Sequence, residues 1–178
     1  MLGYGMHFHN IEGVETPQYV RAFVFEKDWT KLVFVNADFC FSTIMLKERV
    51  LLRLSNEYPQ LGYQDTNVMI TAQHTHSGAG GYTQHLAYNF SMPGFREDVY
   101  VHYSNAIVAA IVKADANLQS ATIHHQIGEF DKDAPVCFNR SVKAINQNPE
   151  IETKFTLKNR HLACDRTMKL LRFDNADG

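Results

Sequence analysis

The feature that most constrains this chain is an apolar run, Val68–Ala72, which leads into two histidines and a glycine-rich loop. Its β-branched and apolar residues lie between turn-forming residues, so the run predicts a short buried strand. His74 and His76 follow the end of this strand, where open α/β sheets bind their ligands. Because residues two apart in extended backbone point to the same side, both imidazoles can face one point in space.

The histidine pair indicates a metal-binding or catalytic role. Imidazole suits zinc, copper, iron and nickel, and one rigid segment can supply two ligands, or one ligand and one base. Gly78, Gly80 and Gly81 allow positive φ angles and close approach of the backbone to a ligand, whose developing negative charge free N–H groups could meet. A chance pairing is the alternative, since the chain has nine histidines and a second pair, His7 and His9, without a strand before it.

Composition narrows the class of protein. With 178 residues, 45% of them hydrophobic, we expect a single domain with a sizeable core. The net charge of −2 and the absence of a basic run argue against nucleic acid as a partner. No segment approaches the roughly 20 uninterrupted apolar residues of a membrane helix. The N-terminus shows no signal peptide pattern.

The chain has three cysteines, Cys40, Cys137 and Cys164. They are odd in number and widely spaced, and no two form a C-x-x-C motif. We therefore expect buried small residues rather than a disulfide framework or a zinc knuckle.

The residues before the histidines predict a hairpin and a helix. Residues 19–26 and 32–37 are β-rich with a short separation, which favours an antiparallel hairpin. Residues 42–58 place Leu46, Val50 and Leu54 four apart, as in an amphipathic helix. The succession of strand, helix and strand predicts a right-handed crossover and a largely parallel core here. Overall we expect an α/β fold, a mixed β-sheet packed by helices.

Asp38 closes the second predicted strand. Its carboxylate could bind or orient a group in the cleft beyond the sheet. It could equally cap the helix that follows. Both interpretations stay open from the sequence.

The residues after the glycine loop are less uniform. Residues 82–94 are aromatic and irregular, and either line a pocket for an apolar substrate or pack against their own domain. Residues 95–118 predict the clearest helix. Its expected apolar face consists of Val99, Tyr103, Ala106, Ile107, Ala110, Ile111, Ala114 and Leu118.

The last third of the chain predicts two strands around a long loop. Residues 121–130 and 168–173 read as strands, and residues 174–178 as a turn. His124 and His125 point to opposite faces of the first strand, so we interpret them as structural. Arg140 lies in the loop, where a solvated arginine is the ordinary interpretation.

Short segments along the whole chain form a further pattern. They are HTHSGAGGY at 74–82, MLGY at 1–4, YVRAF at 19–23, VFVNAD at 33–38, FNRS at 138–141 with NP at 148–149, and DRTM at 165–168. In order and approximate spacing, these segments resemble the neutral (alkaline, non-lysosomal) ceramidase family. That family hydrolyses the amide of N-acylsphingosines to sphingosine and a fatty acid.

The resemblance implies a role for three residues. His74 matches a zinc ligand of the family, and His76 matches a histidine beside the metal, near the reacting carbonyl. Arg140 matches an arginine that reaches the pocket and can hydrogen-bond the polar head of the substrate. The implied mechanism is zinc-assisted amide hydrolysis, in which metal-bound hydroxide attacks the carbonyl.

The resemblance covers this chain but only the first part of the family's larger catalytic domain. The family's other zinc ligands, a histidine, a glutamate and a tyrosine, have no matching positions here, and neither has its serine-bearing segment. Local differences include residues 13–17, Ala79, Val142 and Ile145, where the family has other residues. These differences concern the substrate more than the fold, so another N-acyl lipid or amide stays open.

Three hypotheses follow. The first is the N-terminal part of a zinc-dependent ceramidase-like amide hydrolase, with a ceramide-like lipid as partner and contact with a membrane surface as an option. The second is a truncated, non-catalytic lipid-binding or assembly module. The third is an unrelated metallohydrolase that uses the histidine pair together with Asp38. The compartment stays open, although relatives are usually exported or membrane-facing.

Overall fold

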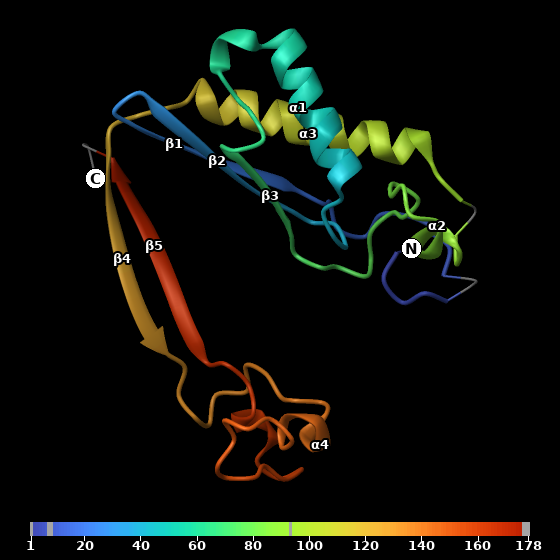
Figure 1. Ribbon diagram of the computed structural model, residues 1–178, viewed down its shortest axis with the longest axis vertical. Coiled ribbons are helices and arrows are strands. Elements are labelled where there is room, and N and C mark those ends of the chain that lie inside the picture. Colours follow the sequence, from blue (N-terminus) through green and yellow to red (C-terminus); the bar gives the residue numbers. More distant parts are fainter. Residues whose placement is uncertain (1, 7–8, 93, 176–178) are drawn as a thin grey trace. The chain divides into compact units, whose positions relative to one another are not determined.

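In the computed structural model, residues 2–6, 9–92 and 94–175 are described, and they divide into a first unit, Met1–Leu118, and a second unit, Gln119–Gly178. The first unit contains a three-stranded sheet and the longer helices, and the second contains a two-stranded ribbon with loops (Figure 1). His7 lies outside the described residues. The expected single domain stays a prediction.

The sheet of the first unit begins with the predicted hairpin. Strands β1 (Val20–Lys27) and β2 (Thr30–Ala37) pair antiparallel along their whole length. Asp28 and Trp29 connect them, with φ angles of 49° and 66°. Positive φ at both positions of a two-residue loop matches the right-handed twist of the strands, which explains the tight turn.

The predicted parallel pairing is also confirmed. Strand β3 (Val68–Ala72) pairs parallel with β2, in the order β1-β2-β3, and its register sets Ala72 opposite Ala37. Helix α1 (Ile44–Glu57) and the short 3-10 helix η1 (Pro59–Leu61) connect the two strands. The ends of β2 and β3 therefore lie at the same edge of the sheet.

Helices α1 and α3 (Glu97–Asp115) pack together on one face of this sheet (Figure 1). As predicted, α1 buries Leu46, Val50 and Leu54. Thr43 caps α1 by accepting a hydrogen bond from the Leu46 N–H at 3.1 Å, so Asp38 is not the cap. The core beneath both helices includes Val33, Val35 and Ala37 of β2.

The predicted face of α3 is confirmed at its centre, where Ile107 and Ile111 are buried. Leu118 lies beyond the end of the helix and is exposed. Ser104 was not expected in the core. Its burial is tolerated because its hydroxyl accepts a hydrogen bond from the Arg49 guanidinium at 3.0 Å, which satisfies it away from water.

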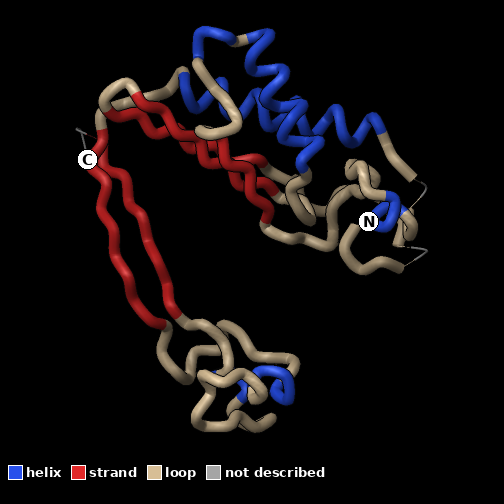
Figure 2. Tube along the Cα trace, in the orientation of Figure 1, coloured by secondary structure: helices blue, strands red, loops and turns tan. Residues whose placement is uncertain are grey.

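The second unit is a long ribbon with loops at one end (Figure 2). Strand β4 (Ala121–Glu129) pairs antiparallel with β5 (Thr167–Asn175), and its nine residues are all exposed. The loops include the short helices α4 (Val142–Ile145) and η2 (Arg160–Leu162). The turn predicted at 174–178 is wrong for Asp174 and Asn175, because both pair in β5. Residues 176–178 lie outside the described residues.

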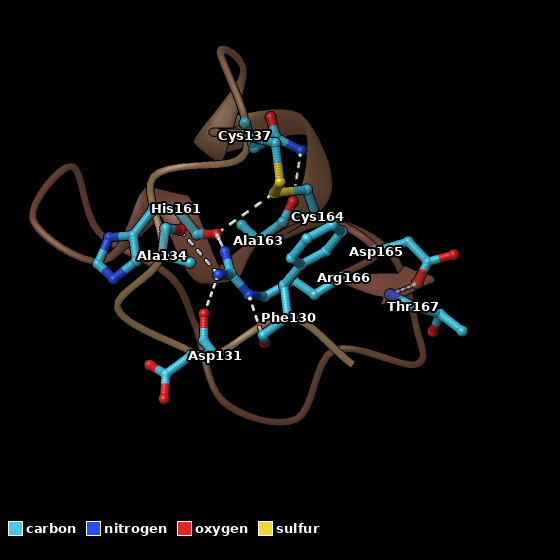
Figure 3. The surroundings of a disulfide bond; sticks show 11 residues. Phe130, Asp131, Ala134, Cys137, His161, Ala163, Cys164, Asp165, Arg166 and Thr167 are labelled. Carbon is cyan, nitrogen blue, oxygen red and sulfur yellow. Dashed lines mark hydrogen bonds between the residues drawn. A yellow bond between two sulfur atoms is a disulfide. The ribbon is translucent and has the colours of Figure 1, made fainter. Parts of the chain in front are cut away.

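The expectation for the cysteines is wrong for two of the three. Cys137 and Cys164 form a disulfide, although they are 27 positions apart in sequence (Figure 3). The antiparallel return of β5 along β4 brings the segments next to both strands together, which sequence spacing alone does not reveal. Cys40 is buried and free, as predicted. Among the described residues, no helix is long and apolar enough to cross a membrane.

Two leucines of α1 test the packing of the core. Leu46 is fully buried and Leu52 is 60% exposed. We expect Leu46→Ala to lower the opening free energy of α1 by about 2–5 kcal/mol, because it leaves a cavity. Leu52→Ala is the matched control and should change that energy by less than about 0.5 kcal/mol. Hydrogen exchange of α1 and β2 in the full-length protein measures both, and equal effects would contradict the assigned core.

Candidate metal centre

The two histidines of the sequence motif lie just beyond the ends of β2 and β3. After β3 the chain continues as a loop (Figure 2). Main-chain hydrogen bonds hold this loop to the chain that follows β2: Gln73 N–H donates to Ala37 O at 3.0 Å, and His74 N–H donates to Phe39 O at 3.2 Å. The strand end predicted from the sequence therefore does position the histidines.

The backbone at His74 differs from the expected extended conformation. His74 has a φ of 63°, in the left-handed region that residues other than glycine rarely adopt. The assumption that residues two apart share a face therefore does not apply here. The rings nevertheless come together, with centroids 4.9 Å apart. Backbone strain of this kind is often retained at functional sites.

The His74 ring is oriented by the main chain. Its Nδ1 lies 2.7 Å from the carbonyl oxygen of Cys40. Because a carbonyl oxygen only accepts hydrogen bonds, Nδ1 carries the proton and Nε2 keeps a free lone pair. Metal-binding histidines usually have this arrangement, in which the second ring nitrogen donates to a carbonyl or carboxylate. The sequence did not single out Cys40 for this role.

The Nε2 atoms of His74 and His76 are 3.3 Å apart. If His76 carries its proton on Nε2, this contact is a hydrogen bond. If the proton is on Nδ1, both lone pairs are available to one ion. Two nitrogens of a tetrahedral zinc site, each about 2.0–2.1 Å from the metal, are about 3.3–3.4 Å apart. The observed separation thus fits two groups around a single zinc ion.

Cys40 forms a group of potential metal ligands with the two histidines, all within 4.8 Å of one another. Its sulfur lies 3.8 Å from Nδ1 of His74, on the side of the ring away from the free Nε2. Burial also raises the pKa of the Cys40 thiol, which disfavours the thiolate that binds metal. We therefore assign Cys40 to the orientation of His74 rather than to a third ligand.

The N-terminal segment holds the His76 ring. Leu2 N–H donates to Gly78 O at 3.2 Å, and the Tyr4 ring packs edge-on against His76 with centroids 4.7 Å apart. Gly3 has a φ of +121°, and a Cβ there would lie 2.5 Å from the His76 ring. Only glycine fits this close approach without displacing the ring. No local signal marked Gly3, which entered only through the family-like segment MLGY.

The three glycines of the loop differ in conformation and surroundings. A Cβ at Gly80 would meet Met92, and one at Gly81 would meet Arg96 and the Gly94 carbonyl. Of the three loop glycines only Gly81 has a positive φ, of 88°. The positive φ expected for the loop is thus confirmed at Gly81, and the chain itself fills the space beside Gly80 and Gly81. Close approach of this backbone to a ligand stays a prediction.

The aromatic stretch that follows is partly core. Tyr82 is fully buried, and its hydroxyl donates to the Phe41 carbonyl at 3.0 Å. Burial raises the pKa of Tyr82, so the phenol stays protonated. Leu86 and Phe90, in or beside the short helix α2 (Leu86–Asn89), are 79% and 75% exposed. Packing therefore explains Tyr82, while these two side chains leave the pocket hypothesis open.

Asp38 has a structural partner. Its carboxylate accepts hydrogen bonds from the Arg21 guanidinium and the Tyr19 N–H, both at 2.9 Å. Burial raises the pKa of Asp38, but these two hydrogen bonds and the charge of Arg21 together lower it by more. The net pKa is therefore below its usual value. Asp38 does not belong to the group of potential metal ligands found among the described residues.

Arg140 belongs to the second unit, where it is exposed. The residues on either side are ordered by hydrogen bonds: Asn139 N–H donates to Arg160 O at 2.9 Å, and Ser141 N–H donates to Asn139 Oδ1 at 2.8 Å. The structure thus brings His74 and His76 together in one site. The role of Arg140 in binding a substrate stays a prediction.

Imidazoles that converge at the end of a parallel strand are typical of metal-dependent α/β enzymes. A comparison with known families identifies the family of this chain. The family described as "Neutral/alkaline non-lysosomal ceramidase, N-terminal" matches residues 1–178. The chain belongs to the neutral/alkaline non-lysosomal ceramidase family.

Individual relatives give the same result. The chain is 37% identical to the neutral ceramidase of Pseudomonas aeruginosa over 155 residues, which are 85% of this chain and 22% of that protein. It is 32% identical to the neutral ceramidase of Mycobacterium tuberculosis, over 99% of this chain and 27% of that protein. The crystal structure of the Pseudomonas aeruginosa neutral ceramidase matches with a TM-score of 0.87 and 33% identity, covering 100% of this chain and 27% of that chain.

A solved structure described as "Ceramidase complexed with C2" matches equally well, with a TM-score of 0.87 and 33% identity. The match covers 100% of this chain and 26% of that chain. The chain thus spans about a quarter of the length of these relatives, and the likeness extends across its whole length. The α/β fold expected from the sequence is confirmed.

Two glycines test the support of His76. Because a Cβ at Gly3 would overlap the His76 ring, we expect Gly3→Ala to move that ring away from His74 and lengthen the 3.3 Å separation of the Nε2 atoms. Gly13→Ala is the control, since nothing lies within 4 Å of a Cβ there. Crystal structures of both variants of the full-length protein measure the separation. An unchanged separation in Gly3→Ala would refute the assigned contact.

Proposed function

We propose that this chain provides part of the active site of a zinc-dependent amide hydrolase that cleaves N-acylsphingosines to sphingosine and a fatty acid. The observation that carries the proposal is the meeting of the His74 and His76 Nε2 atoms at 3.3 Å, with Nδ1 of His74 held by the Cys40 carbonyl. The family match over residues 1–178 and the ceramidase relatives support the reaction class. The proposal concerns a protein that also carries the remaining metal ligands.

His74 is the proposed zinc ligand. Its Nδ1–H bond to the Cys40 carbonyl fixes both the tautomer and the direction of the ring, so that Nε2 is presented without its proton. When bound, zinc would lower the pKa of a water molecule toward about 7 and polarise the amide carbonyl. His74 is exposed, so a substrate can approach this side of the ring.

His76 is the proposed acid-base residue. An amide is a difficult substrate because the departing amine must receive a proton. Because the two Nε2 atoms are 3.3 Å apart, His76 would be next to a metal held by His74 and to the amide that reacts there. The Tyr4 ring and the backbone of Gly3 limit the rotation of the His76 imidazole, which keeps its Nε2 atom directed at that position.

A lipid amide is the proposed substrate. Arg140, in the family-like FNRS segment, would hydrogen-bond the polar head of this substrate, as the resemblance to the family implies. The exposed Leu86 and Phe90, which follow the glycine loop in the same unit as the histidines, are suitable contacts for an apolar chain. Contact with a membrane surface would supply such a substrate.

The second candidate is a non-catalytic lipid-binding or assembly module. The observation behind it is that the group of potential metal ligands found among the described residues contains two imidazoles, whereas zinc hydrolases typically use three protein ligands. Retention of metal and turnover in the full-length protein distinguish the two candidates.

Three variants of the full-length protein test the proposal. We expect His74→Ala to lose both zinc and at least about a thousand-fold in hydrolysis, because it removes a ligand. We expect His76→Ala to keep zinc and lose about 10²–10⁴-fold in kcat, because it removes a proton donor. Asp38→Asn should keep both zinc and turnover, because Asp38 lies outside the group of potential metal ligands found among the described residues. Its single amide oxygen replaces only one of the two carboxylate oxygens that accept from the Tyr19 N–H and the Arg21 guanidinium. Zinc is measured by mass spectrometry and turnover with a fluorescent N-acylsphingosine.

Each alternative has its own outcome. A wild-type protein that holds no zinc and hydrolyses no amide would favour the non-catalytic module. Loss of zinc in Asp38→Asn would favour the unrelated metallohydrolase. Zinc and activity retained by His74→Ala would overturn the proposed site.

A further inference from the structure

The segment that carries Arg140 is fastened to the segment that precedes β5. The disulfide joins Cys137 to Cys164 (Figure 3). Two residues after Cys137, the backbone N–H of Asn139 donates to Arg160 O at 2.9 Å, and its side-chain amide donates to Ala163 O at 3.0 Å. One covalent bond and two hydrogen bonds thus connect the two segments within three residues of Arg140.

The segment before β5 is itself held by a buried charge. Arg166 is 7% exposed, and its guanidinium donates to main-chain carbonyls rather than to a carboxylate (Figure 3). The acceptors are the carbonyl oxygens of Phe130, Asp131, Ala134 and His161. Losing such bonds would leave a buried charge unsatisfied, which is costly, so Arg166 fixes this part of the loop firmly. The disulfide and Asn139 then transmit that rigidity to Arg140.

The contrast within the Arg140 segment is informative. Arg140 is exposed, whereas its neighbour Asn139 uses both its backbone and its side chain to hold the loop. Asn139 also accepts the Ser141 N–H at 2.8 Å, so the backbone is fixed on both sides of Arg140. An exposed cation on an immobilised backbone is the arrangement expected for a side chain that must meet a partner in a defined position.

We propose that the Cys137–Cys164 disulfide and Asn139 together position Arg140 for substrate binding, so that opening the disulfide weakens substrate affinity and leaves the chemical step unchanged. This inference rests on the proposed function, because it takes Arg140 as the contact to the polar head of the lipid amide. A dithiol opens the disulfide: it passes two electrons and two protons to the sulfurs, yields two thiols and is itself oxidised to a disulfide.

Enzyme kinetics of the full-length protein test the inference. We expect the double variant Cys137→Ser/Cys164→Ser to raise KM about tenfold while kcat changes less than about twofold, because a loosened backbone presents Arg140 to the substrate less precisely. A tenfold loss is about what removal of the outer-shell support of a metal ligand costs. Asn139→Asp should act in the same direction, since it loses the donor to Ala163 O but keeps the acceptor for Ser141 N–H. Dithiothreitol on the folded wild type should reproduce the rise without any substitution.

Asn146 supplies the matched control. Its side chain also bridges two loop segments, donating to Phe155 O at 2.9 Å and accepting from Phe155 N–H at 2.8 Å. Asn146 follows the short helix α4 and takes no part in the bonds of Asn139 and Cys137 beside Arg140. Asn146→Ala therefore loosens the same group of loops by a similar number of bonds and should leave KM within about twofold. A general loosening of the loops would raise KM in this control as well.

A double-mutant cycle separates positioning from simple stabilisation. If the disulfide acts through Arg140, the cysteine substitutions should add nothing to the KM of Arg140→Ala. Trypsin gives a second readout that does not depend on turnover: reduction should speed cleavage after Arg140 about tenfold, because the backbone there becomes mobile. Alkylation followed by mass spectrometry verifies which thiols have formed.

The outcomes are distinguishable. A KM that rises in Arg140→Ala but not on removal of the disulfide overturns this inference and leaves the proposed function intact. If the effects of Arg140→Ala and of the cysteine substitutions on KM are fully additive, this inference is likewise overturned and the proposed function stays intact. If oxidised wild type hydrolyses no lipid amide, the proposed function is overturned and this inference with it.

Discussion

The hydrogen bond from Nδ1 of His74 to the Cys40 carbonyl is the interaction on which the site depends. It connects the residues that follow β3 to those that follow β2, across 34 positions of sequence. It decides which ring nitrogen carries the proton, and thereby which one faces outward. Parallel pairing of β2 and β3 makes it geometrically available, because both strands end at the same edge. The chemistry of His74 is thus a consequence of sheet topology.

The sequence predicted the sheet and its histidines because these depend on local patterns. An apolar run with β-branched residues indicated β3, and the four-residue spacing of Leu46, Val50 and Leu54 indicated the packed face of α1. Local patterns could not predict the left-handed backbone at His74. The two rings do come together as predicted, but the extended backbone from which this was inferred is absent at His74. The contacts of Cys40 and Gly3 come from residues distant in sequence, so no spacing rule reveals them.

The second unit was harder to predict because little of it is buried. All nine residues of β4 are exposed, so no buried face imposes a strict alternation of apolar and polar residues on this strand. The pairing of Cys137 with Cys164 follows from the return of the chain and not from the number of cysteines. Likewise, Arg166 looked like any charged residue in the sequence, although it is buried among carbonyl oxygens.

The tight turn between β1 and β2 has a consequence for spectroscopy. Trp29 is the only tryptophan of this chain, and it sits in that turn with 97% of its surface exposed. Its indole is therefore surrounded by water in the folded chain and in the unfolded chain alike. The wavelength of tryptophan emission from this chain would therefore change little on unfolding. It would shift to the blue only when another surface covers the tip of the hairpin.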